Sequence, residues 1–467
     1  MHGTDAHSTE TTRAMAEMVV SLEARHIPAD VLDLITKAFV DGLGCALVGA
    51  DQPEGQIARG WVESLGGAPD STLLGAGGTR APAAMAALAN GVMMHALDYD
   101  DFSLKRMMHP TVVFAPVVLA LGEREGSSGM DVIVAYAAGY ETAARVAKQL
   151  IPDHYARGWH STSTIGGLGA AAAAARLLGL DADGVAMAVA IAASSAAGLR
   201  NNFGTMVKPL HAGNAAFHGV AAAELAARGY TASKGIFDGE RSYQEVYRNE
   251  ETPILSPDGF SLDTLELVES GITFKRYTCC GAIHAALDAT LELRAEHGLT
   301  PDKVASMRCA VHPRAPEILI HHTASTPEQG RFCVEYSLAV AIADGHAGVP
   351  QYTEDRLADP VVQDLARRTE VYVDESLAFN EGAATAISNS VVTIETTDGE
   401  TLVHRVPPHR PMSWDEIERK FRSSATLGIG EDGVEAALAT ARSLPELDNV
   451  GSLLQAFSGA ASAKAPK

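Results

Sequence analysis

The chain has 467 residues, of which 46% are hydrophobic and 20% charged, a composition typical of a globular protein with a sizeable core. Its 36 Lys and Arg residues against 58 Asp and Glu residues give a net charge of −22, which disfavours nucleic acid or an anionic membrane surface as partner. The longest apolar runs, 112–121 and 185–199, are shorter than the roughly 20 residues that a membrane span needs. The five cysteines show no paired framework and the first residues lack the apolar run of a secretory signal, so we expect a cytoplasmic protein.

From about residue 9 to 229, apolar residues recur at three- and four-residue spacing, which predicts helices almost throughout. The predicted helices cover 8–24, 28–48, 82–97, 111–121, 130–150, 166–178, 183–199 and 215–227. Residues 201–213 are rich in Gly, Asn and Pro and are predicted to be a loop, and 71–78 fit either a short extended piece or a loop. Because Ala and Gly dominate the helices, their backbones can approach closely, and an all-helical core is expected.

The pattern changes near residue 271. Predicted strands at 308–312, 370–373, 390–396 and 401–406 are interspersed with helices at 282–297 and 333–343, and Asp398-Gly399 indicates a hairpin between the last two strands. Ser413 and Glu416 have the spacing of a capping box, so a helix is predicted to begin there, with further helices at 432–443 and 449–458. We therefore predict a mainly α protein, with a helical domain formed by 1–270 and 407–467 and a smaller α+β domain at 271–406.

Four places concentrate titratable side chains beside loops or helix ends. They are His95, Asp98, Asp100, Asp101 and His109; Arg157 and His160; Lys208, His211 and His218; and Lys275, Arg276, Cys279, Cys280 and His284. Three carboxylates within four positions repel one another, so at least one should have a raised pKa or a cationic partner. Lys208 and His211 are predicted at a helix N-terminus, which favours anions. Solvated turns, packed histidines and surface lysines would also explain these residues one by one, so each place alone leaves function open.

No template for a cofactor or metal fits the sequence. The chain has no Walker loop, and Gly166-Gly-Leu-Gly169 follows no strand, so it is not a dinucleotide-binding fingerprint. The adjacent Cys279 and Cys280 lack the spacing of zinc or iron–sulfur ligands. We therefore expect acid–base chemistry by His, Lys and Asp side chains, with no metal and no cofactor.

Several longer stretches form a recognisable set. They are Asn90-Gly91, His95-Ala-Leu-Asp98-Tyr-Asp100-Asp101, His109-Pro110, Gly158-Trp159-His160, Gly204-Thr-Met-Val-Lys208-Pro-Leu-His211-Ala-Gly213, Lys275-Arg-Tyr-Thr-Cys-Cys280, His284, and Pro411-Met-Ser with Lys420-Phe421. Together they resemble the MmgE/PrpD family from about residue 10 to 455, and the stretch around Lys208 is the most specific. The resemblance implies a helical domain made from both chain ends, an α+β lid near 271–406, and a homodimer.

The resemblance also implies a metal-free active site between domain and lid that binds a small polycarboxylate. Position by position, the matching catalytic residues are Asp98, His109, His160 and Lys208, and the expected substrate-binding residues are Lys275, Cys280 and His284. The chain departs from the family pattern at Phe102, where Thr is usual, and at Cys280, which we align with a His in one branch. No Tyr lies in 311–326 to match a lid Tyr, and His321 and His322 are the nearest polar candidates.

The expected chemistry is a carbanion or enolate formed next to a carboxylate. Lys208 is expected to act as an electrostatic clamp or base, and His109 and His160 as the acid–base pair, with Asp98 orienting one histidine. Lys208, Lys275 and protonated histidines would bind the carboxylates. The leading prediction is a cofactor-independent hydro-lyase of the 2-methylcitrate dehydratase type, acting on a di- or tricarboxylate. The alternatives are an iminodisuccinate-type epimerase, a cis-aconitate-type decarboxylase, and a non-catalytic polycarboxylate binder.

Overall fold

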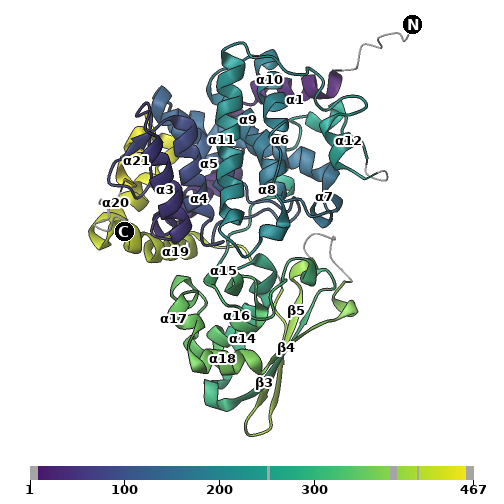
Figure 1. The fold of residues 1–467 in the computed structure, drawn as a ribbon, viewed down its shortest axis with the longest axis vertical. Helices are drawn as coiled ribbons and strands as arrows, with labels where there is room; N and C mark the ends of the chain where they lie inside the picture. The colour runs from purple at the N-terminus through teal and green to yellow at the C-terminus, as the bar shows by residue number, and fades with distance from the viewer. Residues whose placement is uncertain (1–8, 250–252, 379–385, 408–409, 459–467) are drawn as a thin grey trace.

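Two bodies of different size make up the chain in the computed structural model, which describes residues 9–249, 253–378, 386–407 and 410–458 (Figure 1). The larger body is helical apart from one short strand pair, and it contains both the first helices and those that follow residue 410. The smaller body, drawn below it, lies within 271–406, a segment that we call the lid. The mainly α fold with a smaller α+β part, predicted from the sequence, is confirmed.

The helices of the larger body come from both ends of the chain. Before the lid they are α1 (Glu10–Ser21), α2 (Ala29–Gly49), α3 (Pro53–Leu65), α4 (Ala83–His95), α5 (Thr111–Glu125), α6 (Gly129–Leu150), α7 (Asp153–Ala156), α8 (Ser161–Thr164), α9 (Gly166–Leu177), α10 (Ala182–Ala193), α11 (Val207–Ala227), α12 (Tyr243–Tyr247) and α13 (Glu266–Glu269). After the lid they are α19 (Trp414–Ile429), α20 (Glu431–Arg442) and α21 (Gly451–Ala456). The strands β1 (Ser71–Thr72) and β2 (Arg80–Ala81) pair antiparallel, so the first part of 71–78 is extended.

The lid combines a mixed sheet with short helices. Its elements are α14 (His284–His297), β3 (Val304–Val311), α15 (Pro327–Gly330), α16 (Val334–Asp344), α17 (Glu354–Leu357), α18 (Pro360–Arg367), β4 (Thr369–Val373), β5 (Ser390–Thr396) and β6 (Thr401–His404). The strand order is β4-β3-β5-β6, with β3 parallel to β4 and antiparallel to β5. The predicted hairpin is confirmed, because β5 and β6 pair antiparallel on either side of Asp398-Gly399.

One helix boundary near the predicted site differs from the sequence prediction. The predicted loop 201–213 ends early, because α11 begins at Val207 and carries Lys208 and His211 in its first turns. Pro209 suggested a loop, but the first N–H groups of a helix have no partner within that helix, so a proline in the first turn removes no hydrogen bond. The capping box is confirmed: Ser413 accepts a hydrogen bond from the Glu416 backbone N–H, and Glu416 accepts one in return.

Helices α4 and α11 pack so closely that glycine is needed at their contact. A Cβ on Gly213 would lie 2.5 Å from the Leu88 carbonyl oxygen, and one on Gly91 would lie 3.1 Å from Gly213 Cα. The helices run antiparallel, because further along the same contact His95 at the end of α4 meets Lys208 at the start of α11. The small residues of α11 therefore have the role predicted for them, and they bring two ends of the candidate site together.

The apolar core of the described residues is divided between the two bodies. One large cluster runs from Met15 to Phe274 and continues from Met412 to Phe457, so α19–α21 pack with the N-terminal helices. A second cluster fills the lid from Tyr277 to Val406 and also takes in Tyr155 and Phe203 from the helical body. The clusters divide after Phe274, close to the predicted boundary, and we keep 1–270 with 407–467, and 271–406, as proposed folding units.

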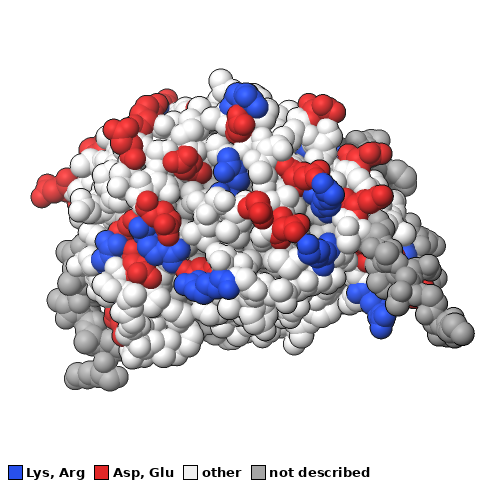
Figure 2. Space-filling model, turned by 90° about the horizontal axis from the view of Figure 1, so that it is seen from above, with Lys and Arg blue, Asp and Glu red and all other residues white. Residues whose placement is uncertain are grey.

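The surface and the helices add two observations about partners. No helix in the described part of the chain is long and apolar enough to cross a membrane. On the face that Figure 2 shows, Lys and Arg residues lie interspersed with more numerous Asp and Glu residues. This face therefore offers no continuous basic surface of the kind that binds a phosphate backbone.

Candidate active site

The turn after α4 brings three aspartates inside the protein. Asp98, Asp100 and Asp101 are all buried, although the residues between two elements are usually exposed. Asp98 has a positive φ of 49°, a left-handed conformation that Asp tolerates better than most residues, because its short polar side chain can hydrogen-bond locally. The turn is therefore folded inward, so each of its carboxylates needs either a cationic partner or a raised pKa.

Asp98 lies between two lysines. Its Oδ1 atom is 2.7 Å from Lys208 Nζ and 2.8 Å from Lys275 Nζ, and Lys275 also donates to the Asp98 carbonyl oxygen. Burial alone would raise the pKa of Asp98, but the two lysines hold it well below its ordinary value. Burial lowers the pKa of Lys208. Burial also opposes the charged form of Lys275, but the carboxylates of Asp98 and Asp100 outweigh it and raise the pKa of Lys275. The cationic partner predicted for this cluster of carboxylates is confirmed.

Asp100 joins two histidines. Its two oxygens lie 2.8 Å from His95 Nδ1 and 2.7 Å from His109 Nδ1, and the carboxylate is completely buried. An ionised carboxylate accepts hydrogen bonds only, so both imidazoles carry their hydrogen on Nδ1 and leave Nε2 bare. His95 Nε2 then accepts from Lys208 at 2.8 Å, whereas His109 Nε2 lies 3.8 Å from Asp98 at the edge of the cavity described below. Asp100, rather than the predicted Asp98, orients a histidine.

The third aspartate is held in a different state. Burial raises the pKa of Asp101 well above its ordinary value, and Asp41 and Asp100 add to that rise against the hydrogen bonds from Thr111. Thr111 in turn shares a hydrogen bond of 2.7 Å with Tyr136. Asp101 thus anchors the start of α5 inside the core, and it fulfils the other half of the prediction, a carboxyl with a raised pKa.

The predicted acid–base residue His160 is paired with another histidine. His160 Nδ1 lies 3.0 Å from His211 Nδ1, and both rings are buried. Burial and, next in size, the positive charge of Lys208 lower the pKa of His160 far below 6.5 and that of His211 to about 4. Burial also lowers the pKa of His109 and, to about 4, that of His95. The lowered pKa values favour neutral imidazoles at neutral pH, so we do not keep protonated histidines as the groups that bind carboxylates.

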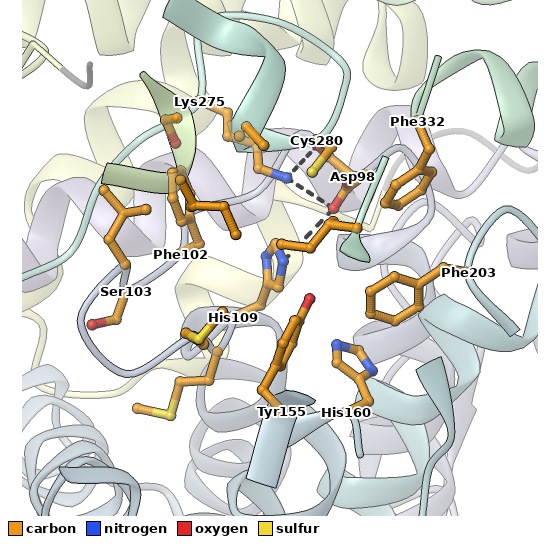
Figure 3. Close-up of a pocket in the computed structure, with 18 of the residues that line it drawn as sticks. Asp98, Phe102, Ser103, His109, Tyr155, His160, Phe203, Lys275, Cys280 and Phe332 are labelled. Atoms are coloured by element: carbon orange, nitrogen blue, oxygen red, sulfur yellow. Dashed lines mark hydrogen bonds and ion pairs between the residues drawn. The ribbon is translucent and has the colours of Figure 1, made fainter. Parts of the chain in front are cut away.

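These groups surround a cavity between the helical body and the lid (Figure 3). Its volume is about 80 Å³, more than one water molecule needs. Asp98, His109, His160, Lys208, Lys275 and Cys280, six of the seven predicted site residues, line it. The rest of the wall is mainly apolar and comes from both bodies: Phe102, Leu104, Met107, Met108, Tyr155, Phe203, Gly281, Ala282, Ile318, Phe332 and Ile387, with Ser103 and Ser388 as polar exceptions.

The lid residues divide into those at the cavity and those away from it. Burial raises the pKa of Cys280 to about 11, so at neutral pH it presents a thiol to the cavity. His284 is not among the described residues that line it, because its ring packs 5.1 Å from that of Tyr277, and we do not keep its predicted role in substrate binding. His321 lies beside Gly204, and His322 bonds to Glu335 at 3.0 Å, so neither replaces the absent Tyr.

Phe102 closes the seam between the two bodies. Its backbone exchanges two hydrogen bonds with Thr273, of 2.9 and 2.8 Å. Its ring lies against Gly281, where an added Cβ would come within 2.8 Å of Phe102 Cζ. A residue that departs from the family pattern thus contributes apolar wall and fixes how closely the lid approaches.

Four ligand atoms near the turn lie close enough together to be considered for a metal. His95, Asp98, Asp100 and His109 each offer one, within 4.8 Å of one another. These atoms already bond to each other and to the lysines, since Lys208 occupies both His95 Nε2 and Asp98 Oδ1. A divalent cation would meet two ammonium groups here, so this donor set fits the lysines better than a metal ion.

Sequence reasoning missed the contributions of several residues. The motif contains His95 and Asp100 but indicates no role for either, although Asp100 sets the tautomers of two histidines. Their spacing of five residues, next to a turn, was the available signal. Tyr155, Phe203 and Phe332 gave no signal, because they come from separate segments that only the folded chain brings to the cavity.

Comparison with known proteins agrees with this fold. The N-terminal domain of the MmgE/PrpD family matches residues 13–255 and its C-terminal domain matches residues 277–446. The chain belongs to the MmgE/PrpD family. It is 29% identical over 466 residues to the cis-aconitate decarboxylase of Homo sapiens, with 96% of this chain and 94% of that protein covered. The corresponding values are 27% over 473 residues, with 96% and 93% covered, for the Mus musculus enzyme and 29% over 479, with 95% and 95%, for that of Aspergillus terreus.

Proposed function

We propose that this chain is a cofactor-independent lyase that removes carbon dioxide from a small carboxylate. The observation that carries the proposal is the buried Lys208–Asp98–Lys275 cluster, which faces a largely apolar cavity beside two neutral imidazoles. The likeness to cis-aconitate decarboxylases along nearly the whole chain supports a carbon–carbon lyase over the carbon–oxygen lyase favoured by sequence reasoning.

The charges at the cavity favour a dicarboxylate among the predicted di- and tricarboxylates. Among the described residues that line the cavity, the lysines and arginines are Lys208 and Lys275, and the negative charge of Asp98 offsets one of these two positive charges. Because the neighbouring histidines are neutral, the net charge is about +1. One substrate carboxylate can take the lysine contacts, and the second, the one that leaves, would lie against the apolar wall.

Decarboxylation breaks one carbon–carbon bond and forms one carbon–hydrogen bond. The bond between the leaving carboxylate and its carbon breaks, and the electron pair stays on that carbon while carbon dioxide departs. Losing a charge inside an apolar wall is favourable, because an ionised carboxylate is costly to bury there. Lys208 and Lys275 stabilise the negative charge that spreads toward the remaining carboxylate. His160 then donates a proton to the carbon, so that one proton is consumed in each turnover.

Dehydration is the second candidate, and the tautomers favour it. Asp100 leaves His109 Nε2 bare and able to accept a proton, whereas His160 can carry one on Nε2. A base and an acid beside the same cavity suit removal of a proton next to a carboxylate and of hydroxide from the neighbouring carbon. The epimerase alternative needs the same pair, on opposite faces of the substrate, and stays a prediction.

The test is turnover in heavy water with a panel of carboxylates that includes cis-aconitate, 2-methylcitrate and four- and five-carbon dicarboxylates. Decarboxylation releases carbon dioxide and leaves one deuterium on the product carbon. Dehydration gives near-ultraviolet absorbance without carbon dioxide, and epimerisation gives a deuterated substrate of the other configuration. Lys208→Ala, shown to be as well folded as the wild type, is the control. If the wild type binds a carboxylate without turning it over, the proposed enzyme is overturned and the non-catalytic polycarboxylate binder is favoured.

We also propose that the enzyme is a cytoplasmic homodimer. Ile57 and Trp61 of α3 and Met206 beside α11 are 63%, 50% and 41% exposed and line an apolar groove, a kind of surface that often mediates association. Sedimentation of the purified protein measures its mass. A monomer at micromolar concentration would contradict the dimer.

A further inference from the structure

A second cavity lies behind the candidate active site and shares none of its lining residues. It measures about 300 Å³ for the centres of water-sized spheres, and its polar lining includes Ser163, Asn202, His211, Asn214 and His218. Ser195, Ala197 and Leu199, which also line it, are exposed, so the second cavity opens to solvent. The catalytic cavity lies on the other side of His160.

The His160–His211 pair is the wall between the two cavities. His160 lines the catalytic cavity and His211 lines the second one, and their Nδ1 atoms are 3.0 Å apart. The pair is held in register by the backbone, since His160 N–H donates to Gly198 O at 3.0 Å and Ser163 donates to His211 O at 3.2 Å. A direct nitrogen–nitrogen hydrogen bond therefore links a side chain at the catalytic cavity to one at the second cavity, which is open to solvent.

We propose that His211 delivers protons from the second cavity to His160, which makes it a proton-relay residue of this enzyme. The inference rests on the proposed function, because it assumes that His160 protonates the substrate carbon. It goes further by naming the route of the proton. A decarboxylase needs one solvent proton in each turnover, and a substrate that fills the small catalytic cavity would block a direct path for water.

The chemistry of two neutral imidazoles permits this transfer. Facing Nδ1 atoms share one hydrogen, and a neutral imidazole carries its hydrogen on one nitrogen only. When His211 is the donor, His160 carries its own hydrogen on Nε2, and His211 Nε2 is bare. Water in the second cavity protonates His211 Nε2, the Nδ1 hydrogen passes to His160, and the Nε2 hydrogen of His160 passes to the carbanion.

Three bonds to hydrogen break and three form, no charge stays on the pair, and the negative charge of the carbanion ends on the hydroxide that the water becomes in the second cavity. After transfer His160 Nε2 is bare, and the pair returns to its starting state when water enters the emptied catalytic cavity and the transfer runs in reverse. The titratable groups that face the pair are Lys208, His95 and His109. The positive charge of Lys208 opposes an imidazolium on either ring, which favours a concerted transfer over a stored cation.

His211→Ala and His218→Ala form a matched pair of tests, because both residues line the second cavity and His211 is the one bonded to His160. We expect His211→Ala to lower kcat about 100-fold, with KM changed less than about twofold, since general acid catalysis contributes at least that much. Imidazole added to the solution should enter the enlarged second cavity and restore at least about tenfold of the loss. His218→Ala should keep the wild-type kcat.

Retention of kcat in folded His211→Ala, or a loss that imidazole does not restore at all, would overturn the relay. If His211→Ala does not fold, His211→Gln serves, because an amide can bond to His160 but cannot pass a proton through. A readout independent of turnover is ¹⁵N spectroscopy of histidine-labelled protein, in which coupling across the Nδ1–H···Nδ1 bond is expected in the wild type and in His218→Ala. If the wild type shows no such coupling, the relay is rejected, whichever carboxylate is turned over. If the coupling is present but no carboxylate is turned over, the proposed function is rejected instead.

Discussion

The two sides of the catalytic cavity are built differently. The helical side supplies Asp98, His109, His160 and Lys208, which are held by helix ends and by a turn folded into the core. The lid beyond the segment that carries Lys275 supplies apolar wall, such as Phe332, together with the neutral thiol of Cys280. The difference teaches that the larger body holds most of the charged and titratable groups, whereas the lid adds Lys275, a neutral thiol and part of the apolar wall.

The two contributions depend on each other through the dielectric. Two unit charges about 4 Å apart interact by about 1 kcal/mol in water and by about 4 kcal/mol at an effective dielectric constant of 20. The lysine–carboxylate contacts therefore gain strength when the apolar wall excludes water. Substitutions on the helical side should therefore lower kcat strongly. Substitutions at the seam between the two bodies should have smaller effects, on kcat and KM together, because they weaken the closure of the lid over the cavity.

Lys208→Ala is expected to have the largest effect, a fall in kcat of about 1,000-fold or more, because it removes a charge-assisted contact worth about 2–4 kcal/mol and any role as a base. The fold should persist, since Asp98 keeps Lys275 as its partner. Lys234→Ala, which removes an exposed lysine paired with Asp183, is the control and should not change kcat. Activity within about tenfold of the wild type would remove Lys208 from the mechanism.

Lys420 differs from Lys208 in the partners of its carboxylate. It is also a buried lysine, 2.6 Å from Asp41, but no second lysine of the described residues lies within ion-pair distance of Asp41. Breaking such a pair leaves an uncompensated charge and typically costs about 3–5 kcal/mol of stability. Lys420→Ala is therefore expected to lower the melting temperature, and Lys208→Ala to lower it much less.

For dehydration, in which His109 is the base, Asp100→Asn should lower kcat about 100-fold or more by changing the tautomer of His109, because an amide can donate to Nδ1 and so move the hydrogen to Nε2. Burial lowers the pKa of His109 below 6.5 while Asp100 opposes that shift. The acid limb of the wild-type kcat/KM profile is thus expected below pH 6.5, and the variant should lose activity at a still lower pH. An acid limb that moves to higher pH would contradict the assigned hydrogen bonds.

The sequence predicted the chemical groups of the site better than their arrangement. The motifs identified Lys208, His160 and Asp98, and helical periodicity predicted most of the larger body. The pairing of His160 with His211 could not be predicted, because it depends on where α11 begins, and Pro209 suggested a later start. The apolar wall was also beyond reach, since residues such as Tyr155 and Phe332 are far apart in the chain.

Lys275→Ala tests the seam and is expected to raise KM and lower kcat by about tenfold each. Lys275 is buried and bonds to both the side chain and the backbone carbonyl of Asp98, so it ties the start of the lid to the catalytic turn. A bound carboxylate should protect residues 271–284 and 206–213 from hydrogen exchange together. Protection confined to the helical body, with unchanged kinetics of the variant, would mean that the substrate does not bridge the two bodies.

The smallest expected effect is that of a chelator, which should leave kcat unchanged. The four candidate ligands between His95 and His109 lie against Lys208 and Lys275, which already bond to Asp98. A divalent cation about 4 Å from one ammonium group would be repelled by about 8 kcal/mol at an effective dielectric constant of 20, and the second lysine adds to this. The same two ammonium groups attract a carboxylate, so the charges that would bind the substrate oppose a metal ion. Loss of activity after dialysis against EDTA, restored by one added metal, would show that a lysine leaves this cluster when the enzyme works, and it would replace the electrostatic clamp with a metal-bound carboxylate.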